Sequence, residues 1–147
     1  MFAVKVFRPD AYQSDSEMQS LLSEVELAEG LDHENLLRTH GKMLVAGQWP
    51  AIMMELMVCS LHEYLHDRKS WMPSINYAAQ HRIACGVSRG VAHMHDVLKM
   101  THRDLKPMNV VLDRQIELAK VSDFGFATRF GMERSTGGTL RCKADDF

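Results

Sequence analysis

The spacing of hydrophobic positions changes along the chain, and the first third favours strands. Residues 2–7, FAVKVF, alternate and are rich in β-branched and aromatic side chains, which is typical of a strand. Residues 14–31 carry apolar side chains at helical spacing behind a capping Ser14 or Ser16, and they predict a helix. Two further strands are predicted over residues 36–45 and 51–56, with a turn between them.

Helical spacing dominates the chain after residue 57. Residues 61–68 predict a short helix, and residues 75–95 predict a long helix with one apolar face. That face carries Tyr77, Ile83, Val87, Val91 and Met94. The remaining predicted elements are strands over 110–112 and 119–121 and a polar loop over 132–147. The pattern therefore predicts an α+β chain with a boundary near residues 57–60.

Composition and charge narrow the class of protein. The chain has 147 residues, with 46% hydrophobic and 24% charged, which is ordinary for a globular domain. A net charge of -2 predicts neither a nucleic-acid nor an anionic-membrane partner, and no apolar run approaches the roughly 18 residues of a membrane span. Cys59, Cys85 and Cys142 are dispersed and odd in number, which favours reduced thiols and a cytoplasmic protein.

The stretch HRDLKPMN at residues 102–109 places several charged residues immediately before a predicted apolar strand. Asp104 can accept a proton from a hydroxyl, and Lys106 can neutralise charge on a transferring phosphate. Asn109 can offer a neutral oxygen to a hard cation, and Pro107 stiffens the backbone between them. The pattern predicts a rigid catalytic loop.

A second polar site follows a predicted strand. Asp123-Phe124-Gly125 comes 19 residues after Asp104 and directly after the strand at 119–121. An aspartate at a strand end before a glycine turn suits Mg²⁺, which favours one or two carboxylates together with phosphate oxygens. We therefore expect Asp123 to be a magnesium ligand.

These motifs together resemble those of the eukaryotic protein kinases. HRDLKPMN is similar to the catalytic loop H-R-D-L-x-x-x-N, Asp123-Phe124-Gly125 to D-F-G, and Phe2-Ala3-Val4-Lys5 to the V-A-I-K strand. The resemblance runs from residue 2 to about residue 140. It implies a bilobal fold, here incomplete, with a partial N-lobe over 1–57 and a partial C-lobe over 58–147.

The resemblance also implies ATP and Mg²⁺ as cofactors and assigns roles to residues. Lys5 is similar to the lysine that holds the ATP α- and β-phosphates. Its glutamate partner is expected to be Glu24, nine residues before His33, with Glu17, Glu26 and Glu29 as rivals. Met54 resembles the gatekeeper, and Glu55-Leu56-Met57 resembles the hinge that receives the adenine.

In the catalytic region the resemblance assigns proton transfer to Asp104 and the two Mg²⁺ ions to Asn109 and Asp123. Lys106 resembles the serine/threonine class, so the expected substrate is a protein Ser or Thr. His102 is expected to pack between the lobes. Thr139 is expected to face Asp104, and Ser135 and Thr136 are candidate phosphorylation sites.

Two parts of the family pattern are missing from the sequence. Only four residues precede Lys5, which leaves no room for the glycine-rich loop, and A-P-E does not follow Thr139. The lysine strand is then expected to be an exposed edge, and the long helix to expose part of its apolar face. We expect serine/threonine kinase chemistry in a weakly active chain. The alternatives are an inactive module that binds another kinase or a scaffold, and a gene fragment.

Overall fold

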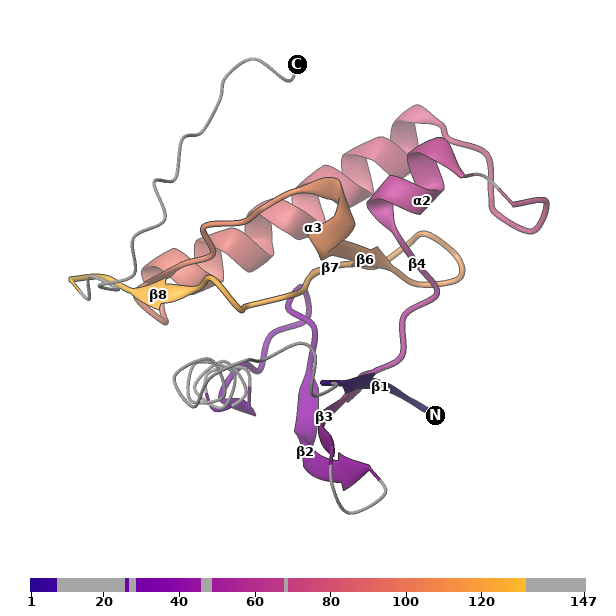
Figure 1. Cartoon of the computed structure of the whole chain (residues 1–147). Coiled ribbons are helices and arrows are strands. Elements are labelled where there is room, and N and C mark those ends of the chain that lie inside the picture. Colours follow the sequence, from indigo (N-terminus) through magenta and orange to yellow (C-terminus); the bar gives the residue numbers. More distant parts are fainter. Residues whose placement is uncertain (8–25, 27–28, 46–48, 68, 132–147) are drawn as a thin grey trace.

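The computed structural model describes residues 1–7, 26, 29–45, 49–67 and 69–131. The structure places three small sheets and two α-helices along this part of the chain (Figure 1). The predicted Lys5 partner Glu24 lies outside the described residues, as do Thr139, Ser135 and Thr136. Among the described residues, no helix combines the length and the apolar character that crossing a membrane requires.

The first sheet has the strand order β1-β3-β2, with all pairs antiparallel. Its strands are β1 (Phe2–Val6), β2 (Thr39–Val45) and β3 (Trp49–Glu55). β1 is an edge strand, and Phe2, Val4 and Val6 are exposed along it. Lys5 lies opposite Ile52, and Phe7 packs with Ile52 and Met54 in a small cluster. Among the described residues, the strand that carries Lys5 is therefore hydrogen-bonded to a neighbouring strand on one side.

Several strand boundaries in the first sheet differ from the prediction, and both β1 and β3 end one residue early, at Val6 and at Glu55. The predicted strand over 36–45 begins only at Thr39, because the residues before it leave the sheet. Leu36 instead forms a parallel bridge with Val121, and the Leu37 N–H donates to the Val121 carbonyl at 2.8 Å. β3 begins at Trp49 rather than at Ala51. Leu36 and Leu37 are both buried, and their apolar character therefore suggested a strand of the first sheet. They are buried outside that sheet.

The larger part of the molecule combines short strands with a long helix (Figure 1). A second antiparallel sheet has the order β4-β6-β7, and a third pairs β5 with β8. The bounds are β4 (Cys59–Ser60), α2 (Leu61–His66), α3 (Tyr77–Asp96), β5 (Met100–Thr101), the 3-10 helix η2 (Pro107–Asn109), β6 (Val110–Leu112), β7 (Ala119–Val121) and β8 (Thr128–Arg129). The predicted boundary near residues 57–60 falls between β3 and β4.

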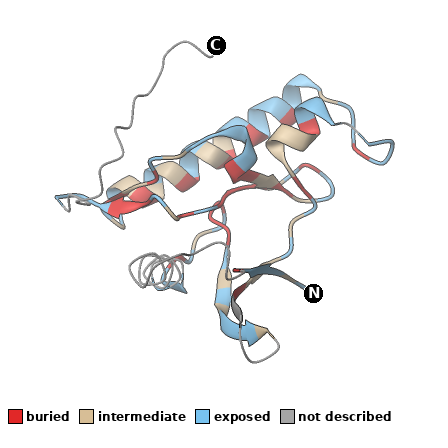
Figure 2. Cartoon of the chain, viewed as in Figure 1, coloured by how far each residue is buried: buried red, intermediate tan, exposed pale blue. Residues whose placement is uncertain are grey.

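Helix α3 packs against β7 and the segment before β2. Ile83 and Met94 are buried, and buried positions follow one side of the helix (Figure 2). A Cβ on Gly90 would lie 2.6 Å from the Asn35 carbonyl oxygen, so glycine permits this close approach. Tyr77 was predicted on the apolar face, but it is 81% exposed because it opens the helix, beyond the core.

Helix α2 is shorter than the predicted 61–68 and ends at His66. Its start is a capping box, in which the Glu63 N–H donates to Ser60 Oγ and the Ser60 N–H donates to the Glu63 carboxylate at 2.8 Å. The hydrogen bonds that the Ser60 N–H and the Ser60 hydroxyl donate to the Glu63 carboxylate lower the pKa of Glu63. The box fixes how the chain leaves β4 and enters the helix.

Candidate active site

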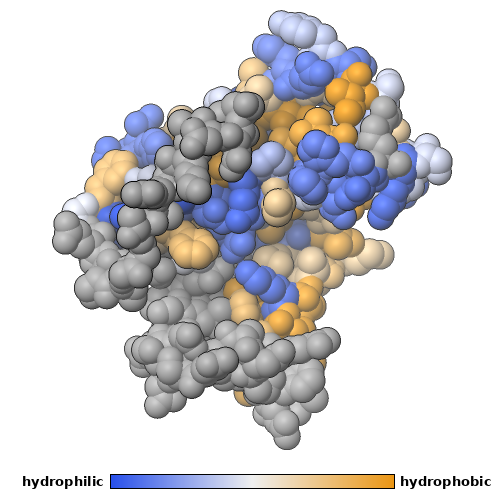
Figure 3. Space-filling view, turned by 45° about the horizontal axis from the view of Figure 1, so that its top comes forward, coloured by the Kyte–Doolittle hydropathy of each residue, from blue (hydrophilic) through white to orange (hydrophobic). Residues whose placement is uncertain are grey.

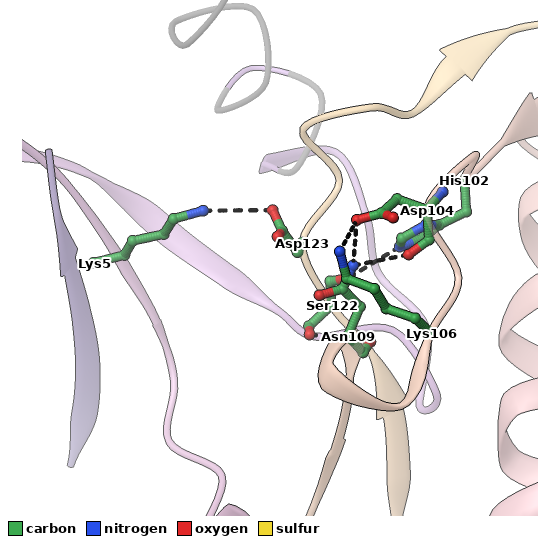
Figure 4. A network of polar contacts seen from close by, with 7 residues as sticks. All are labelled: Lys5, His102, Asp104, Lys106, Asn109, Ser122 and Asp123. Carbon is green, nitrogen blue, oxygen red and sulfur yellow. Dashed lines mark hydrogen bonds and ion pairs between the residues drawn. The ribbon is translucent and has the colours of Figure 1, made fainter. Parts of the chain in front are cut away.

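The loop 102–109 holds Asp104 through its neighbours in the sequence (Figure 4). Lys106 Nζ lies 2.7 Å from one Asp104 carboxylate oxygen, and Asn109 Nδ2 donates to the same oxygen at 2.9 Å. The hydrogen bond from Lys106 lowers the pKa of Asp104, and the bond from Asn109 adds to this effect. Asp104 is therefore an ionised acceptor at neutral pH, placed beside a cation.

His102 fastens this loop to the strand that precedes Asp123. Its ring is buried, and Nδ1 accepts a hydrogen bond from the Asp104 N–H at 3.2 Å. Because Nδ1 is an acceptor, Nε2 carries the proton and donates to the Ser122 carbonyl at 2.9 Å. The ring also contacts Phe124, with 5.6 Å between the centroids.

Asn109 makes a second connection between the same two segments. Both of its amide hydrogens are used, because Nδ2 donates to the Asp104 backbone carbonyl at 2.8 Å as well as to the carboxylate. The Asn109 carbonyl accepts from the Ser122 N–H at 2.8 Å and from Ser122 Oγ at 3.1 Å. The side-chain Oδ1 is thus the atom that Asn109 can offer to a cation.

Asp123 lies two residues beyond the end of β7 in a left-handed backbone conformation, with φ of 61°. Such a conformation is uncommon for a residue other than glycine and is often found at functional sites. Lys5 Nζ lies 3.4 Å from Asp123 Oδ1, and the two side chains are equally exposed. Figure 4 shows Lys5 extending from β1 toward Asp123. Two residues 118 positions apart in the sequence are therefore in contact.

A cavity of about 250 Å³ lies between the first sheet and the loop carrying Asp123. Its walls combine apolar side chains with four polar ones. The apolar side chains include Leu37, Ile52, Met54 and Val111, and the polar ones include Lys5, Asn109 and Asp123. Its volume is slightly below the roughly 300–1,000 Å³ typical of small-ligand sites. The structure thus brings together Lys5, Met54, Asn109 and Asp123.

The other predicted site residues lie around this cavity rather than in its walls. Asn109, which lines the cavity, donates a hydrogen bond to the Asp104 carboxylate, and Lys106 forms an ion pair with the same carboxylate. Neither Glu55 nor Met57 is among the described residues that line it. Instead, the Glu55 N–H donates to the Arg38 carbonyl at 2.9 Å, and its carboxylate points to Lys120.

Lys120, Ser122 and Asn35 contribute to the site region and were not predicted. Lys120 is buried in β7, and Asn35 Nδ2 donates to the Ala119 carbonyl at 2.9 Å. A signal existed for Lys120, since a lysine between two apolar residues of a buried strand requires a partner. For Ser122 and Asn35 the sequence offers no comparable signal, because their partners are backbone groups distant in the chain.

The polar set fits a nucleotide with Mg²⁺. Among the described residues, no group of three or more His, Cys, Asp or Glu side chains is arranged to hold a metal ion. One carboxylate, Asp123, and one amide oxygen, on Asn109, match a cation that takes few protein ligands and completes its shell with water and phosphate oxygens. Lys5 supplies positive charge for phosphates, and the apolar walls suit a base.

A solved structure shows the same fold. The chain resembles a protein of the yeast RNA Pol II CTD kinase CTDK-1 complex with a TM-score of 0.70 and 22% identity, over 87% of this chain and 39% of that one. This likeness confirms the predicted α+β, kinase-like and incomplete fold. The solved chain is longer, so it covers parts that have no counterpart here.

Curated relatives are kinases of several kinds. An Arabidopsis thaliana receptor-like serine/threonine-protein kinase is 34% identical over 86% of this chain and 34% of its own length. A Drosophila melanogaster mitogen-activated protein kinase kinase kinase 7-like protein is 30% identical over 98% and 36%. A brassinosteroid LRR receptor kinase of Oryza sativa subsp. japonica is 38% identical over 71% and 10%. The chain thus spans about a third or less of these relatives.

The prediction of a cytoplasmic protein is wrong as it stands. It rested on the dispersed cysteines and the lack of a long apolar run, and several relatives are named as receptors or receptor-like kinases. Only 10% of the rice receptor's length is matched, so the match covers a small part of that protein and does not show where this chain is located.

The family model described as "Protein kinase domain" matches residues 1–144, almost the whole chain. This match agrees with the motifs and with the fold. Members of the family use ATP and Mg²⁺, and the polar set described above fits both. The chain belongs to the protein kinase family.

Proposed function

We propose that the chain carries the chemistry of a serine/threonine protein kinase, the transfer of the ATP γ-phosphate to a Ser or Thr hydroxyl of a protein. The observation that carries the proposal is the link between Asp104 and the Asp123 segment, made by Asn109 and His102. It sets a proton acceptor at a fixed position relative to a cation ligand. Relatives named as serine/threonine kinases support the choice of acceptor.

Each residue has a chemical role in this proposal. Asp104 orients the substrate hydroxyl and takes its proton, which its lowered pKa permits at neutral pH. Lys106, 2.7 Å from Asp104, stabilises negative charge on the transferring group. Asn109 and Asp123 hold Mg²⁺, and Lys5 holds phosphate oxygens. Bound Mg²⁺ and these cations spread the charge that develops during transfer.

The nucleotide is proposed to place its base against the apolar walls near Met54. The backbone of Glu55-Leu56-Met57 offers hydrogen-bonding groups beside that wall, which suits adenine. Glu24 is proposed to pair with Lys5. The Ser or Thr acceptor belongs to a protein substrate.

A second candidate is a kinase-like module that binds another kinase or a scaffold. Two surfaces favour it: the exposed edge of β1 and an apolar groove of about 610 Å³ between α2, α3 and the loop. Ile83, Val87 and Leu105 are among its lining residues. Figure 3 shows hydrophobic residues gathered on the surface and bordered by hydrophilic ones.

Thermal unfolding with and without Mg-ATP tests the first proposal. At about 100 times its dissociation constant, Mg-ATP adds roughly 2.7 kcal/mol to the free energy of unfolding. We expect the wild type to be stabilised and Asp123→Ala not to be. Asp113→Ala, which changes an aspartate of the β6–β7 turn, is the control and keeps the shift.

Transfer of labelled phosphate to a Ser- and Thr-rich acceptor protein then separates the two candidates. Kinase chemistry predicts labelling by the wild type and none by Asp104→Ala. A chain that binds Mg-ATP but labels nothing is the binding module, and a chain without a Mg-ATP shift has no nucleotide site.

A further inference from the structure

A buried ion pair joins the end of β3 to β7, outside the residues that line the nucleotide cavity. Lys120 Nζ lies 2.7 Å from a Glu55 carboxylate oxygen. The Lys120 side chain is only 9% exposed, and that of Glu55 is 31% exposed. A lysine that is nine-tenths buried needs its partner, because an unpaired charge in the interior is strongly unfavourable.

The geometry of β7 explains why Lys120 faces Glu55. Ala119 packs in the buried cluster that includes Ile83 of α3, and Val121 packs in the one that includes Met94 of α3. Side chains alternate along a strand, so Lys120 points to the opposite face, toward the first sheet. Three residues later comes Asp123, and the intervening Ser122 is buried and bonded to Asn109.

Backbone hydrogen bonds make the connection around this pair rigid. The Glu55 N–H donates to the Arg38 carbonyl at 2.9 Å, the Leu37 N–H donates to the Val121 carbonyl at 2.8 Å, and the Val121 N–H donates to the Asn35 carbonyl at 2.9 Å. The segment 35–38 therefore contacts both Glu55 and β7. The Lys120–Glu55 ion pair links Glu55 directly to β7, so the segment 35–38, Glu55 and β7 are each connected to the other two.

We propose that Lys120 is a positioning residue for the nucleotide site, which sets the distance between the hinge after Glu55 and the cation ligand Asp123. The inference rests on the proposed nucleotide site. A ligand that spans both ends of the cavity requires this distance to be correct, whereas a ligand that contacts only the hinge end does not. Removal of the pair then weakens binding of the spanning ligand selectively.

The experiment compares Mg-ATP with adenosine by calorimetric titration of the wild type, Lys120→Met and Lys120→Arg. For Lys120→Met we expect the affinity for Mg-ATP to fall about tenfold or more, because small displacements of aligned groups are costly. The affinity for adenosine is expected to change much less. Lys120→Arg keeps the charge and is expected to keep most of the Mg-ATP affinity. Lys42→Met, an exposed lysine of β2, is the matched control and keeps both affinities.

A purely structural role would lower the melting temperature of Lys120→Met without changing the ratio of the two affinities in the folded protein, and this result would overturn the proposal. Should Lys120→Met not fold, Glu55→Asp replaces it, since it shortens the partly exposed partner by one methylene; an unchanged ratio again overturns the proposal. A wild type that binds neither ligand overturns the nucleotide site and the positioning role together. A wild type that binds both, with variants that match it, overturns only the positioning role.

Discussion

The Nε2–H of His102 donates to the carbonyl oxygen of Ser122 across 2.9 Å, which anchors the loop of Asp104 on the residue before Asp123. The other ring nitrogen accepts from the Asp104 backbone. The His102 ring thus fixes the position of the proposed proton acceptor, Asp104, relative to the proposed cation ligand, Asp123. A ring without nitrogen atoms cannot do so.

Replacement of His102 by phenylalanine tests this role. We expect His102→Phe to lower the free energy of unfolding by about 1–3 kcal/mol, because the buried Ser122 carbonyl and the partly buried Asp104 N–H lose their partner. Urea unfolding measures the change. His66→Phe, at an exposed position of α2, is the control and is expected to change stability by less than about 0.5 kcal/mol. Equal effects of the two variants would contradict an anchoring role.

Stability near Asp104 depends on pH with a definite sign. The pKa of Asp104 is lowered in the folded state, mainly by Lys106, so the folded protein binds this proton less tightly than the unfolded chain does. Its contribution is fully present above the unfolded pKa of about 3.9 and is lost as the pH falls through the lower folded value. We expect Asp104→Asn to be less stable than the wild type at pH 7 and the difference to shrink in acid. A difference that stays constant from neutral to acid pH would show that Asp104 is not held by charge.

Another chain segment approaches helix α3 closely at Gly90. A Cβ there would meet the Asn35 carbonyl oxygen at 2.6 Å, so Gly90→Ala forces the helix and the segment 35–38 apart. We expect a loss of about 1–3 kcal/mol, as overpacked cores show, despite the higher helix propensity of alanine. Ser88→Ala, at an exposed position of the same helix, is the control in a thermal melt. A stabilised Gly90→Ala would mean that the contact relaxes without cost.

The capping box of α2 is a separate source of stability. Ser60→Ala removes the side-chain acceptor for the Glu63 N–H and is expected to lower the free energy of unfolding by about 1 kcal/mol. Ser60→Thr retains the acceptor and the hydroxyl that donates to Glu63, and it is expected to recover most of the loss. Chemical unfolding of both variants gives the comparison, and an Ala variant as stable as the wild type would rule out the cap as a contributor.

The sequence predicted local features well where the chain itself supplies the signal. The strands at 110–112 and 119–121 have the predicted bounds, and the residues of HRDLKPMN lie in one loop as expected from their adjacency. Among the described residues the lysine strand β1 lies at an edge of the first sheet, as predicted. The predicted membership of the protein kinase family was confirmed by the family model.

Features that depend on distant partners could not be predicted in the same way. Leu36 and Leu37 follow an apolar pattern that fits a strand of the first sheet, yet they bond to Val121. The direction of the Glu55 side chain depends on Lys120, 65 residues away. Hydrophobic periodicity reports which side of an element is buried, but it carries no information on which element covers it.

The contact between Lys5 and Asp123 also has a consequence for how the protein is made. The two residues are separated by 118 positions, and a ribosome adding about 5–20 residues per second needs about 6–24 s to cover that interval. During this time β1 exists without the loop that its lysine faces. The proposed nucleotide cavity therefore assembles only after the segment around Asp123 has been made, and until then the first sheet is available to chaperones and to neighbouring nascent chains.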